Sequence, residues 1–246
     1  QDYAGALTAD GTLDSSGGTI TVNDAVSGTR LTAQAGGAIN LLGDVGGEAE
    51  DGRLTTVDLS GSSVGAQAVY TSGNQDYAGA LTADGTLDSS GGDITVNDVV
   101  SGSSLTILAE GAIALLDDIG SAGATLASVT LDGASVRTQA VYTSGNQDYT
   151  GPLTANGTLD SSGGDISIND AVVGTSLSAT AGGNINLQGD VGGEAEGQRL
   201  TTVDLSGSSV DTQAVYTSGN QDYAGALTAD GTLDSSGGTI TVNDAV

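Results

Sequence analysis

The sequence lacks several residue types altogether, and each absence excludes a kind of site. Its 246 residues include no cysteine, methionine, tryptophan, phenylalanine, histidine or lysine, and only one proline. Without cysteine or histidine, disulfides, Cys/His zinc sites, c-type haem attachment and catalysis by either residue are excluded. The chain also has no initiator methionine and no signal peptide, so we expect a mature piece or an excised segment of a longer protein.

Positive charge is scarce as well. Four arginines stand against 31 aspartates and glutamates, which gives a formal net charge of -27. Such a charge repels nucleic-acid phosphates and anionic membranes, so we predict no nucleic-acid partner. It suits a salt-rich or extracellular setting, where ions screen the repulsion beyond about 8 Å. We therefore expect a secreted protein that lies outside the cell or on its surface.

Large aliphatic side chains are few. Leucine, isoleucine and valine together number 53, about a fifth of the chain, whereas glycine alone numbers 41. This is too little bulk to fill one conventional globular core. The longest apolar run, residues 112–116, is far short of the roughly 20 residues that a membrane span requires.

What the chain does contain is a tandem repeat. The segment QDYAGALTADGTLDSSGGTITVNDAV occupies 1–26 and recurs unchanged at 221–246, with close copies at 75–100 and 147–172. We therefore define repeat 1 (1–74), repeat 2 (75–146), repeat 3 (147–220) and partial repeat 4 (221–246). Self-similarity at a fixed period is typical of arrays in which each unit packs against the next.

Repeat 2 differs in length from its neighbours at one place. GGEAEDGR (46–53) and GGEAEGQR (192–199) correspond to the shorter GSAGAT at 120–125. A length change between aligned flanks is typical of a solvent-exposed loop. Arg53 and Arg199 end the longer loops near several glutamates, so we expect surface ion pairs of little energetic weight. These glutamates are Glu48, Glu50, Glu194 and Glu196.

The pattern within a repeat indicates β-structure throughout. Residues 19–23, 38–41 and 55–59 alternate polar and apolar side chains, and turn-forming Gly, Asn, Asp and Ser clusters follow every six to ten residues. Short strands with frequent corners predict an all-β fold, a parallel β-helix or β-solenoid, whose narrow core needs few aliphatics. A coil of about 18 to 25 residues gives three or four coils per repeat, each rising about 4.8 Å. Equivalent acids of successive repeats are then not stacked on adjacent coils.

One proline marks a local interruption. Pro152 stands where the other repeats carry alanine, inside the Tyr-x-Gly-x-Leu stretch. Because proline cannot donate to a strand ladder, we predict a corner, a bulge or a strand start there. We expect Leu7 and its equivalents, which follow this position, to point inward.

In order, the motifs of one repeat are YAGALTADGTLDSSGGTITVNDAV, LTAQAGGAINLLGDVGG, LTTVDLSGSSV and QAVYTSGNQDY. This ordered set resembles the β-strand repeats of large bacterial exoproteins of the filamentous haemagglutinin-like adhesin class, and the resemblance covers the whole chain. It implies a right-handed parallel β-helix stalk on a long secreted or surface-anchored protein. Such repeats act as a spacer or adhesive shaft, while other modules carry binding and secretion.

Paired acids recur in the motif Asp-Gly-Thr-Leu-Asp. They are Asp10/Asp14, Asp84/Asp88 and Asp230/Asp234, with Asn156 in place of the first acid in repeat 3. Two carboxylates can hydrolyse glycosides, a known use of β-helices, but an enzyme needs one asymmetric cleft whereas this pair recurs in every repeat. We interpret the pairs, and also Asn23-Asp24 and Asp117-Asp118, as corner residues, and we predict no catalytic, cofactor-binding or metal residues. Calcium held by neighbouring loops stays open as the alternative for these acids.

Two further features could carry binding. The tyrosines form two series, Tyr3, Tyr77, Tyr149, Tyr223 and Tyr70, Tyr142, Tyr216. We expect them to pack around the corner with their hydroxyls reaching water, although a carbohydrate-binding row is the alternative. A regular threonine array based on 19–21 is not supported because later repeats replace the first threonine with aspartate. Asn156-Gly157-Thr158 matches a glycosylation acceptor once.

From these observations we expect a mechanical and spacing role without catalysis, in an extracellular adhesin stalk or fibre that contacts a cell surface or matrix. The competing expectation is a filament, sheath or surface layer that assembles by head-to-tail stacking of copies, because open solenoid ends are templates for strand pairing. A β-helical polysaccharide-acting enzyme is a remote third possibility.

Overall fold

The computed structural model describes residues 1–244 and divides the chain into two compact units of stacked coils. Unit 1 comprises residues 1–119 and 131–134, and unit 2 comprises residues 120–130 and 135 onward. Residues 245–246, the end of the predicted partial repeat 4 (221–246), lie outside the described residues.

Unit 1 consists of short β-strands and one 3-10 turn, η1 (Glu50–Gly52). Its strands are β1 (Asp2–Tyr3), β2 (Leu7–Ala9), β3 (Thr12–Ser15), β4 (Ile20–Val22), β5 (Val26–Gly28), β6 (Arg30–Ala35), β7 (Ala38–Leu41), β8 (Thr56–Ala66), β9 (Val69–Thr71), β10 (Gln75–Ala83), β11 (Thr86–Ser89), β12 (Ile94–Val96), β13 (Val100–Ser101) and β14 (Leu105–Leu115). Strand β15 (Val129–Thr138) contributes residues to both units.

Unit 2 has the same composition, with the 3-10 turn η2 (Glu196–Gln198). Its strands are β16 (Val141–Thr143), β17 (Gln147–Thr150), β18 (Leu153–Ala155), β19 (Thr158–Ser161), β20 (Ile166–Ile168), β21 (Ser176–Ala181), β22 (Ile185–Leu187), β23 (Thr202–Thr212), β24 (Val215–Thr217), β25 (Gln221–Ala229), β26 (Leu233–Ser235) and β27 (Ile240–Val242).

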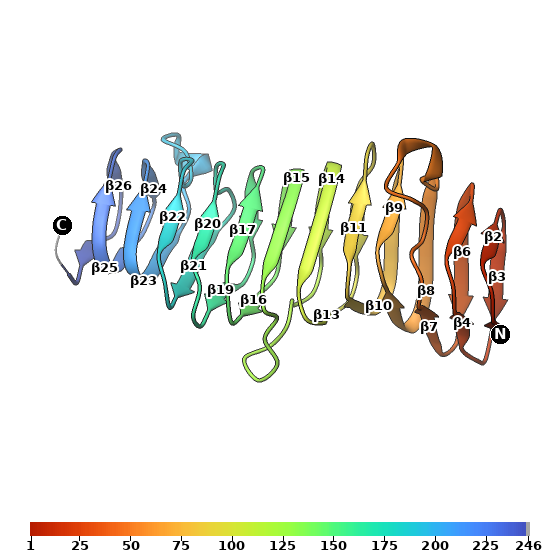
Figure 1. Ribbon diagram of the computed structural model, residues 1–246. Helices are drawn as coiled ribbons and strands as arrows, with labels where there is room; N and C mark the ends of the chain where they lie inside the picture. Colours follow the sequence, from red (N-terminus) through yellow and green to blue (C-terminus); the bar gives the residue numbers. More distant parts are fainter. Residues whose placement is uncertain (245–246) are drawn as a thin grey trace. The chain divides into compact units, whose positions relative to one another are not determined.

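Within each unit the strands of one coil pair in parallel with those of the next, as the stacked arrows in Figure 1 show. Residues 1–244 contain no α-helix. One ladder passes from Val64 to Leu81 and on to Val100, so each of these steps along the chain is one coil. The coil from Ile39 to Val64 is longer, because the η1 loop intervenes. The predicted all-β fold, a parallel β-solenoid, is confirmed.

Three inward-facing ladders run through unit 1, one on each side of the coil. Ladder A contains Leu7, Val26, Val45, Val69, Leu87 and Ile107. Ladder B contains Ile20, Ile39, Val64, Leu81, Val100 and Ile119. Ladder C contains Leu31, Val57, Gln75, Ile94 and Ile113.

The sequence repeat is out of step with the coil. Leu81 lies three coils after Ile20 in ladder B. Ile94 is the repeat equivalent of Ile20. After Leu81 in ladder B, the chain passes Leu87 in ladder A and then reaches Ile94 in ladder C, which is two-thirds of a coil further on. One repeat therefore spans about three and two-thirds coils, within the predicted three to four. Equivalent positions of successive repeats consequently face different sides.

Unit 2 has the same offset. Leu153 pairs with Val172, whereas its repeat equivalent Leu227 pairs with Val210, and Val210 pairs with Ile185 in a separate ladder. Each motif therefore lies on a different side of the coil in successive repeats. Val, Leu and Ile occupy the inward positions on all of these sides. Identical acids are thereby separated around the coil as well as along the stack.

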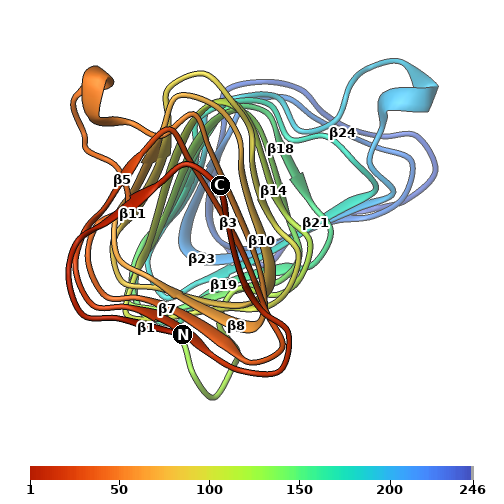
Figure 2. The same ribbon diagram turned by 90° about the vertical axis from the view of Figure 1, so that its right-hand side faces the viewer.

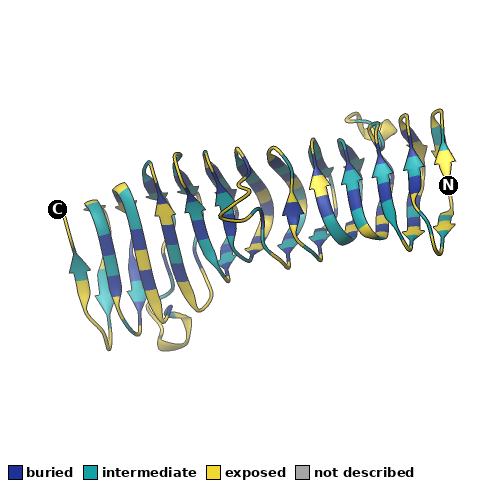
Figure 3. Cartoon of the chain, turned by 90° about the horizontal axis from the view of Figure 1, so that it is seen from below, coloured by how far each residue is buried: buried dark blue, intermediate teal, exposed yellow. Residues whose placement is uncertain are grey.

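The core of each unit is the narrow space that the coils enclose. Buried and exposed residues alternate along the strands (Figure 3), as in β12 and β20, where two buried aliphatics flank a half-buried polar residue. Leu81 and Leu153 are fully buried and Leu227 is 4% exposed, which confirms the predicted inward orientation. Leu7, in the first coil of unit 1, is only half-buried.

The two longer loops project from their coils, as predicted. Figure 2 shows the η1 loop of unit 1, in orange, standing outside the closed turns of that unit. Glu50 and Asp51 in this loop are exposed, and the turn closes with a hydrogen bond from Gly47 N to Gly52 O of 2.8 Å. The shorter segment 120–125 in unit 2 forms a tight turn in which Ser121 and Ala124 pair.

Pro152 lies between two strands, β17 and β18, and directly precedes the latter. Its carbonyl oxygen accepts a hydrogen bond from Val136 N at 2.9 Å. The equivalent alanines, Ala80 and Ala226, lie inside the continuous strands β10 and β25. Of the three predicted alternatives, a corner, a bulge or a strand start, the structure has a strand that starts directly after this proline.

Gly79, the glycine of the Tyr-x-Gly motif in repeat 2, explains a shift of register. The pairing of β10 with β8 slips between Ala78 and Ala80, and Gly79 has φ +129°. A β-carbon at this position would lie 2.1 Å from the carbonyl oxygen of Gly61 in the neighbouring coil. Only glycine permits this backbone and this close approach.

Candidate functional site

The interior of the coils contains a repeated polar cluster. Tyr77 is fully buried, and its hydroxyl donates a hydrogen bond of 2.7 Å to Gln75 Oε1. Gln75 Nε2 in turn donates to Thr71 Oγ1 at 3.1 Å and to the carbonyl oxygen of Asp88 at 2.9 Å. Since Thr71, Gln75 and Asp88 stand in strands of neighbouring coils, the cluster joins these coils from the inside.

The same cluster recurs in unit 2. Tyr149 bonds Gln147 at 2.8 Å and Tyr223 bonds Gln221 at 2.9 Å, again with a buried threonine as the next partner. Burial raises the pKa of all three tyrosines. The expectation that these hydroxyls reach water is therefore wrong for Tyr77, Tyr149 and Tyr223. A buried glutamine two residues earlier supplies the acceptor instead.

Two members of the second tyrosine series, Tyr70 and Tyr216, lie beside the arginines of the long loops. The Arg53 guanidinium carbon lies 5.7 Å from the ring centre of Tyr70, and that of Arg199 lies 5.6 Å from the ring centre of Tyr216. Both separations are within the range of cation–π attraction. These tyrosines are half-buried and pack around the corner, as expected.

Arg53 makes its main ion pair with an acid of the following repeat. Its guanidinium donates to both carboxylate oxygens of Asp88, at 3.0 and 2.8 Å, and to the carbonyl oxygen of Thr71 at 3.2 Å. Glu50 Oε2 is more distant, 3.7 Å from Arg53 Nε. The predicted ion pair with a loop glutamate is therefore present at Glu50. The Arg53 side chain is only 9% exposed, however, and its shorter bonds to Asp88 form a largely buried clamp across coils that the sequence did not predict. The hydrogen bond to Asp88 raises the pKa of Arg53.

Arg199 repeats this clamp in unit 2. Its Nη2 lies 2.7 Å from Asp234 Oδ2, and the hydrogen bond raises the pKa of Arg199 and lowers that of Asp234. Repeat 2 carries Thr125 where the long loops carry arginine, and within residues 1–244 no arginine forms this clamp with Asp160, the counterpart of Asp88 and Asp234.

Among the other predicted corner acids, Asp10, Asp24 and Asp117 accept hydrogen bonds from backbone amides. Asp10 accepts a hydrogen bond from Thr29 N at 2.8 Å, which lowers the pKa of Asp10. Asp24 and Asp117 each accept one from the following residue, also at 2.8 Å. Asp84 and Asp230, the first acids of their pairs, lie at coil corners after the strands β10 and β25. These positions match the predicted corner role, since Asp side chains favour turns in which they cap nearby amides. The second acids of the pairs, Asp14, Asp88 and Asp234, lie within the strands β3, β11 and β26, so the corner prediction is wrong for them.

At another corner, side-chain oxygens of one coil accept hydrogen bonds from backbone amides of the next coil. Asn74 Oδ1 accepts from Asp93 N at 3.0 Å, and Asp93 Oδ1 accepts from Ala112 N at 2.8 Å, one coil further on. Asp93 is the residue that replaces the first threonine of the 19–21 motif, so this substitution has a structural role. In the described chain, 1–244, no group of three or more acids stands close enough to hold a metal ion, and the calcium alternative stays untested.

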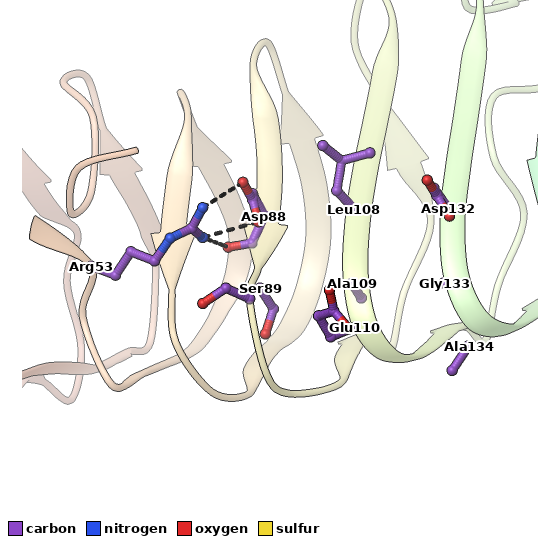
Figure 4. A pocket seen from close by; sticks show the side chains of 10 residues that line it. Arg53, Asp88, Ser89, Leu108, Ala109, Glu110, Asp132, Gly133 and Ala134 are labelled. Carbon is purple, nitrogen blue, oxygen red and sulfur yellow. Dashed lines mark hydrogen bonds and ion pairs between the residues drawn. The ribbon is translucent and has the colours of Figure 1, made fainter. Parts of the chain in front are cut away.

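The surface of unit 1 has a groove of about 610 Å³ beside the Arg53–Asp88 clamp (Figure 4). Three strands line it in succession, with Asp88 and Ser89 on β11, Leu108 to Glu110 on β14, and Asp132 to Ala134 on β15. Asp88 and Leu108 are register partners on adjacent coils, and the small residues Ala109, Gly133 and Ala134 leave the hollow between them.

One carboxylate of the groove is paired with an arginine of the described chain, and two are not. Asp88 is neutralised by Arg53, so it is poorly suited to act as a general acid or base. Glu110 and Asp132 carry the other two carboxylates, and among residues 1–244 neither has an assigned hydrogen bond or ion pair. Neither acid was predicted from the sequence as a site residue. The available signal was that both stand where the other repeats have Gly or Ser.

Comparisons of the chain with family models, with curated proteins and with solved structures gave no match. Within the part of the chain that the structure describes, no helix has the length and apolar character needed to cross a membrane. The fold and the contacts above are therefore the basis for a functional assignment.

Proposed function

We propose that this chain is a structural repeat segment of an extracellular adhesin stalk or fibre, in which the stacked coils act as a rigid spacer and adhesive shaft. The main support is that each coil buries its inward-facing aliphatic side chains against the coils before and after it, as in ladders A, B and C of unit 1. Length can then increase coil by coil without a larger core.

Rigidity is supported by bonds that cross several coils. The Gln75–Tyr77 cluster ties neighbouring coils from the inside, and the Arg53 clamp ties the η1 loop to two following coils from the outside. A spacer that transmits force benefits from both, because separating the coils requires breaking aliphatic contacts and polar bonds together. The net charge of -27 suits an extracellular setting, with a cell surface or matrix as the contacted target.

The proposal is tested by changing the repeat number. Variants with one full repeat removed or added would be imaged by electron microscopy and measured by small-angle X-ray scattering. At about 4.8 Å per coil, each repeat should change the particle length by about 18 Å while the cross-section stays constant. A change in diameter, or a compact sphere at every repeat number, would contradict a spacer.

Head-to-tail assembly into a filament, sheath or surface layer is the second candidate. It is favoured by the exposure of Ile240, 41%, whereas the equivalent Ile20, Ile94 and Ile166 are fully buried by neighbouring coils. Further coils of a longer chain or a second copy would cover this surface equally well. Light scattering as a function of concentration separates the two, because fibres that lengthen with concentration favour assembly and a constant monomer mass favours the stalk.

A further inference from the structure

Repeat 2 differs from both other full repeats at the groove. Leu108 replaces Gln34 and Thr180, Glu110 replaces Gly36 and Gly182, Asp132 replaces Ser60 and Ser206, and Ala134 replaces Ser62 and Ser208. All four substituted residues line the same hollow of unit 1. Because the four substitutions lie together in one groove, they jointly change the chemistry of that groove.

The substitutions replace uncharged polar residues and glycine by two acids and an apolar side chain. Leu108 is 36% exposed in the groove, between the rows that carry Asp88 and Asp132 (Figure 4). Glu110 and Asp132 add two carboxylates, and the only cation of the lining, Arg53, is already bound to Asp88. The groove therefore presents a net charge of about -2 next to an aliphatic side chain, which complements a ligand that combines cationic groups with an aliphatic stem.

The groove also has a rigid end that is suited to an extended chain. The Arg53 side chain is largely buried and held by two carboxylate bonds. The row from Asp88 through Leu108 follows successive coils, so contacts repeat along the groove at about 4.8 Å. A linear ligand can engage them in sequence.

We propose that this groove binds an extended cationic peptide segment of a partner, with lysine or arginine side chains paired to Glu110 and Asp132 and their methylene stems packed on Leu108. Charge complementarity favours a peptide of this kind over a neutral or acidic saccharide, because the lining has two unpaired acids and no aromatic platform among its residues. The proposal goes beyond the spacer role and does not depend on it.

The chain itself provides the variants for a test. Glu110→Gly/Asp132→Ser restores the residues of repeats 1 and 3 at these positions, and Leu108→Gln restores the residue of repeat 1 without a change of charge. The matched control is Asp117→Gly/Asp211→Gly, which also removes two exposed acids and also introduces residues that other repeats carry, Gly43 and Gly65. Neither control residue lines the groove. Circular dichroism would verify that each variant retains its β spectrum, and Glu110→Gln/Asp132→Asn serves as a second, nearly isosteric test.

Binding of a fluorescein-labelled peptide of alternating lysine and valine would be measured by fluorescence anisotropy at physiological salt. We expect binding to be about tenfold weaker for Glu110→Gly/Asp132→Ser and for Glu110→Gln/Asp132→Asn, and about threefold weaker for Leu108→Gln. The control should bind within about twofold of the natural chain. Equal losses for groove and control variants would overturn the proposal in favour of general attraction to an acidic surface. Absence of peptide binding, or binding of a neutral oligosaccharide in its place, would overturn it as well.

Discussion

Arg53 and Asp88 are joined by two hydrogen bonds, Nη1 to Oδ1 at 3.0 Å and Nη2 to Oδ2 at 2.8 Å, although 35 residues separate them in the chain. The bond ties the long loop of repeat 1 to a strand of repeat 2. It crosses an intervening coil, where the carbonyl oxygen of Thr71 accepts a further hydrogen bond from Arg53 Nη1. The clamp therefore holds a projecting loop against two following coils.

Removing this clamp should loosen the coils beneath it. We expect Arg53→Ala to lower the free energy of unfolding by about 1–2 kcal/mol, because it removes charge-assisted bonds to a partly exposed carboxylate. Hydrogen exchange should accelerate at Thr71 and Asp88 in particular. Arg30→Ala, which removes an exposed arginine, is the control and should leave both measurements unchanged. Equal effects of the two substitutions would show that the clamp adds nothing.

The second clamp makes stability depend on pH. Arg199 lowers the pKa of Asp234 below its usual 3.8. A carboxyl group with a depressed folded-state pKa stabilises the fold above its unfolded-state pKa and loses this contribution as the pH falls through the folded-state value. The contribution of Asp234 should therefore be complete above about pH 4–5 and disappear at lower pH. In a carbon-13 NMR titration, Arg199→Ala should move the pKa of Asp234 upward, and an unchanged value would refute the assignment.

Two equivalent glycines should respond differently to substitution. Gly79→Ala places a β-carbon against Gly61 O at a φ that alanine rarely adopts, so we expect a loss of about 2 kcal/mol or more in unfolding free energy. Gly5 occupies the same position of repeat 1, but a β-carbon added there would have no atom within 4 Å, so Gly5→Ala should be nearly neutral. Urea unfolding of both variants measures the difference. Similar losses would mean that the close contact between coils is not the cause.

The buried tyrosines should resist ionisation. Burial raises the pKa of Tyr77, Tyr149 and Tyr223, so these groups bind their protons more tightly in the folded than in the unfolded chain. Stability is then retained below the ordinary tyrosine pKa of about 10 and declines as the pH rises beyond it. Ultraviolet titration should show the three buried tyrosines ionising only as the β spectrum is lost. Ionisation of all seven before unfolding would contradict their burial.

The inner hydrogen bond is tested separately from burial. Tyr77→Phe retains the ring and removes the hydroxyl that donates to Gln75, so we expect a loss of about 1 kcal/mol in unfolding free energy. Gln75→Leu should cost more, because it leaves the Tyr77 hydroxyl without its acceptor in a buried place. Tyr3→Phe in the first coil, where the tyrosine is only half-buried, is the control. A larger effect of Tyr3→Phe than of Tyr77→Phe would rule out the inner cluster as a source of stability.

The fold was predictable because its determinants are local and repeated. Alternation at 19–23 and 38–41 marked strands β4 and β7, the length change at 46–53 marked a loop, and Pro152 marked a strand start. Each of these signals depends only on the backbone chemistry of neighbouring residues. Their recurrence in several repeats made the solenoid prediction secure.

Contacts between coils were not predictable in the same way, because they depend on register. Arg53 lies beside Glu50 in sequence, yet the winding of the coils brings Asp88 closer. Gln75 gives no sign in the sequence that it accepts a bond from Tyr77 inside the core. The groove, likewise, results from positions 108, 110 and 132, which become neighbours only when β14 and β15 lie on adjacent coils (Figure 4).

The mismatch between repeat and coil has a consequence for a gene that gains or loses repeats. Because one repeat covers about three and two-thirds coils, inserting a copy leaves each local junction intact but turns everything downstream by about a third of a revolution. A change in the number of repeats would thus rotate the residues that follow the insertion around the coil axis, as well as move them along it. Only adding or removing three repeats, or a multiple of three, would leave these residues on the same side of the coil.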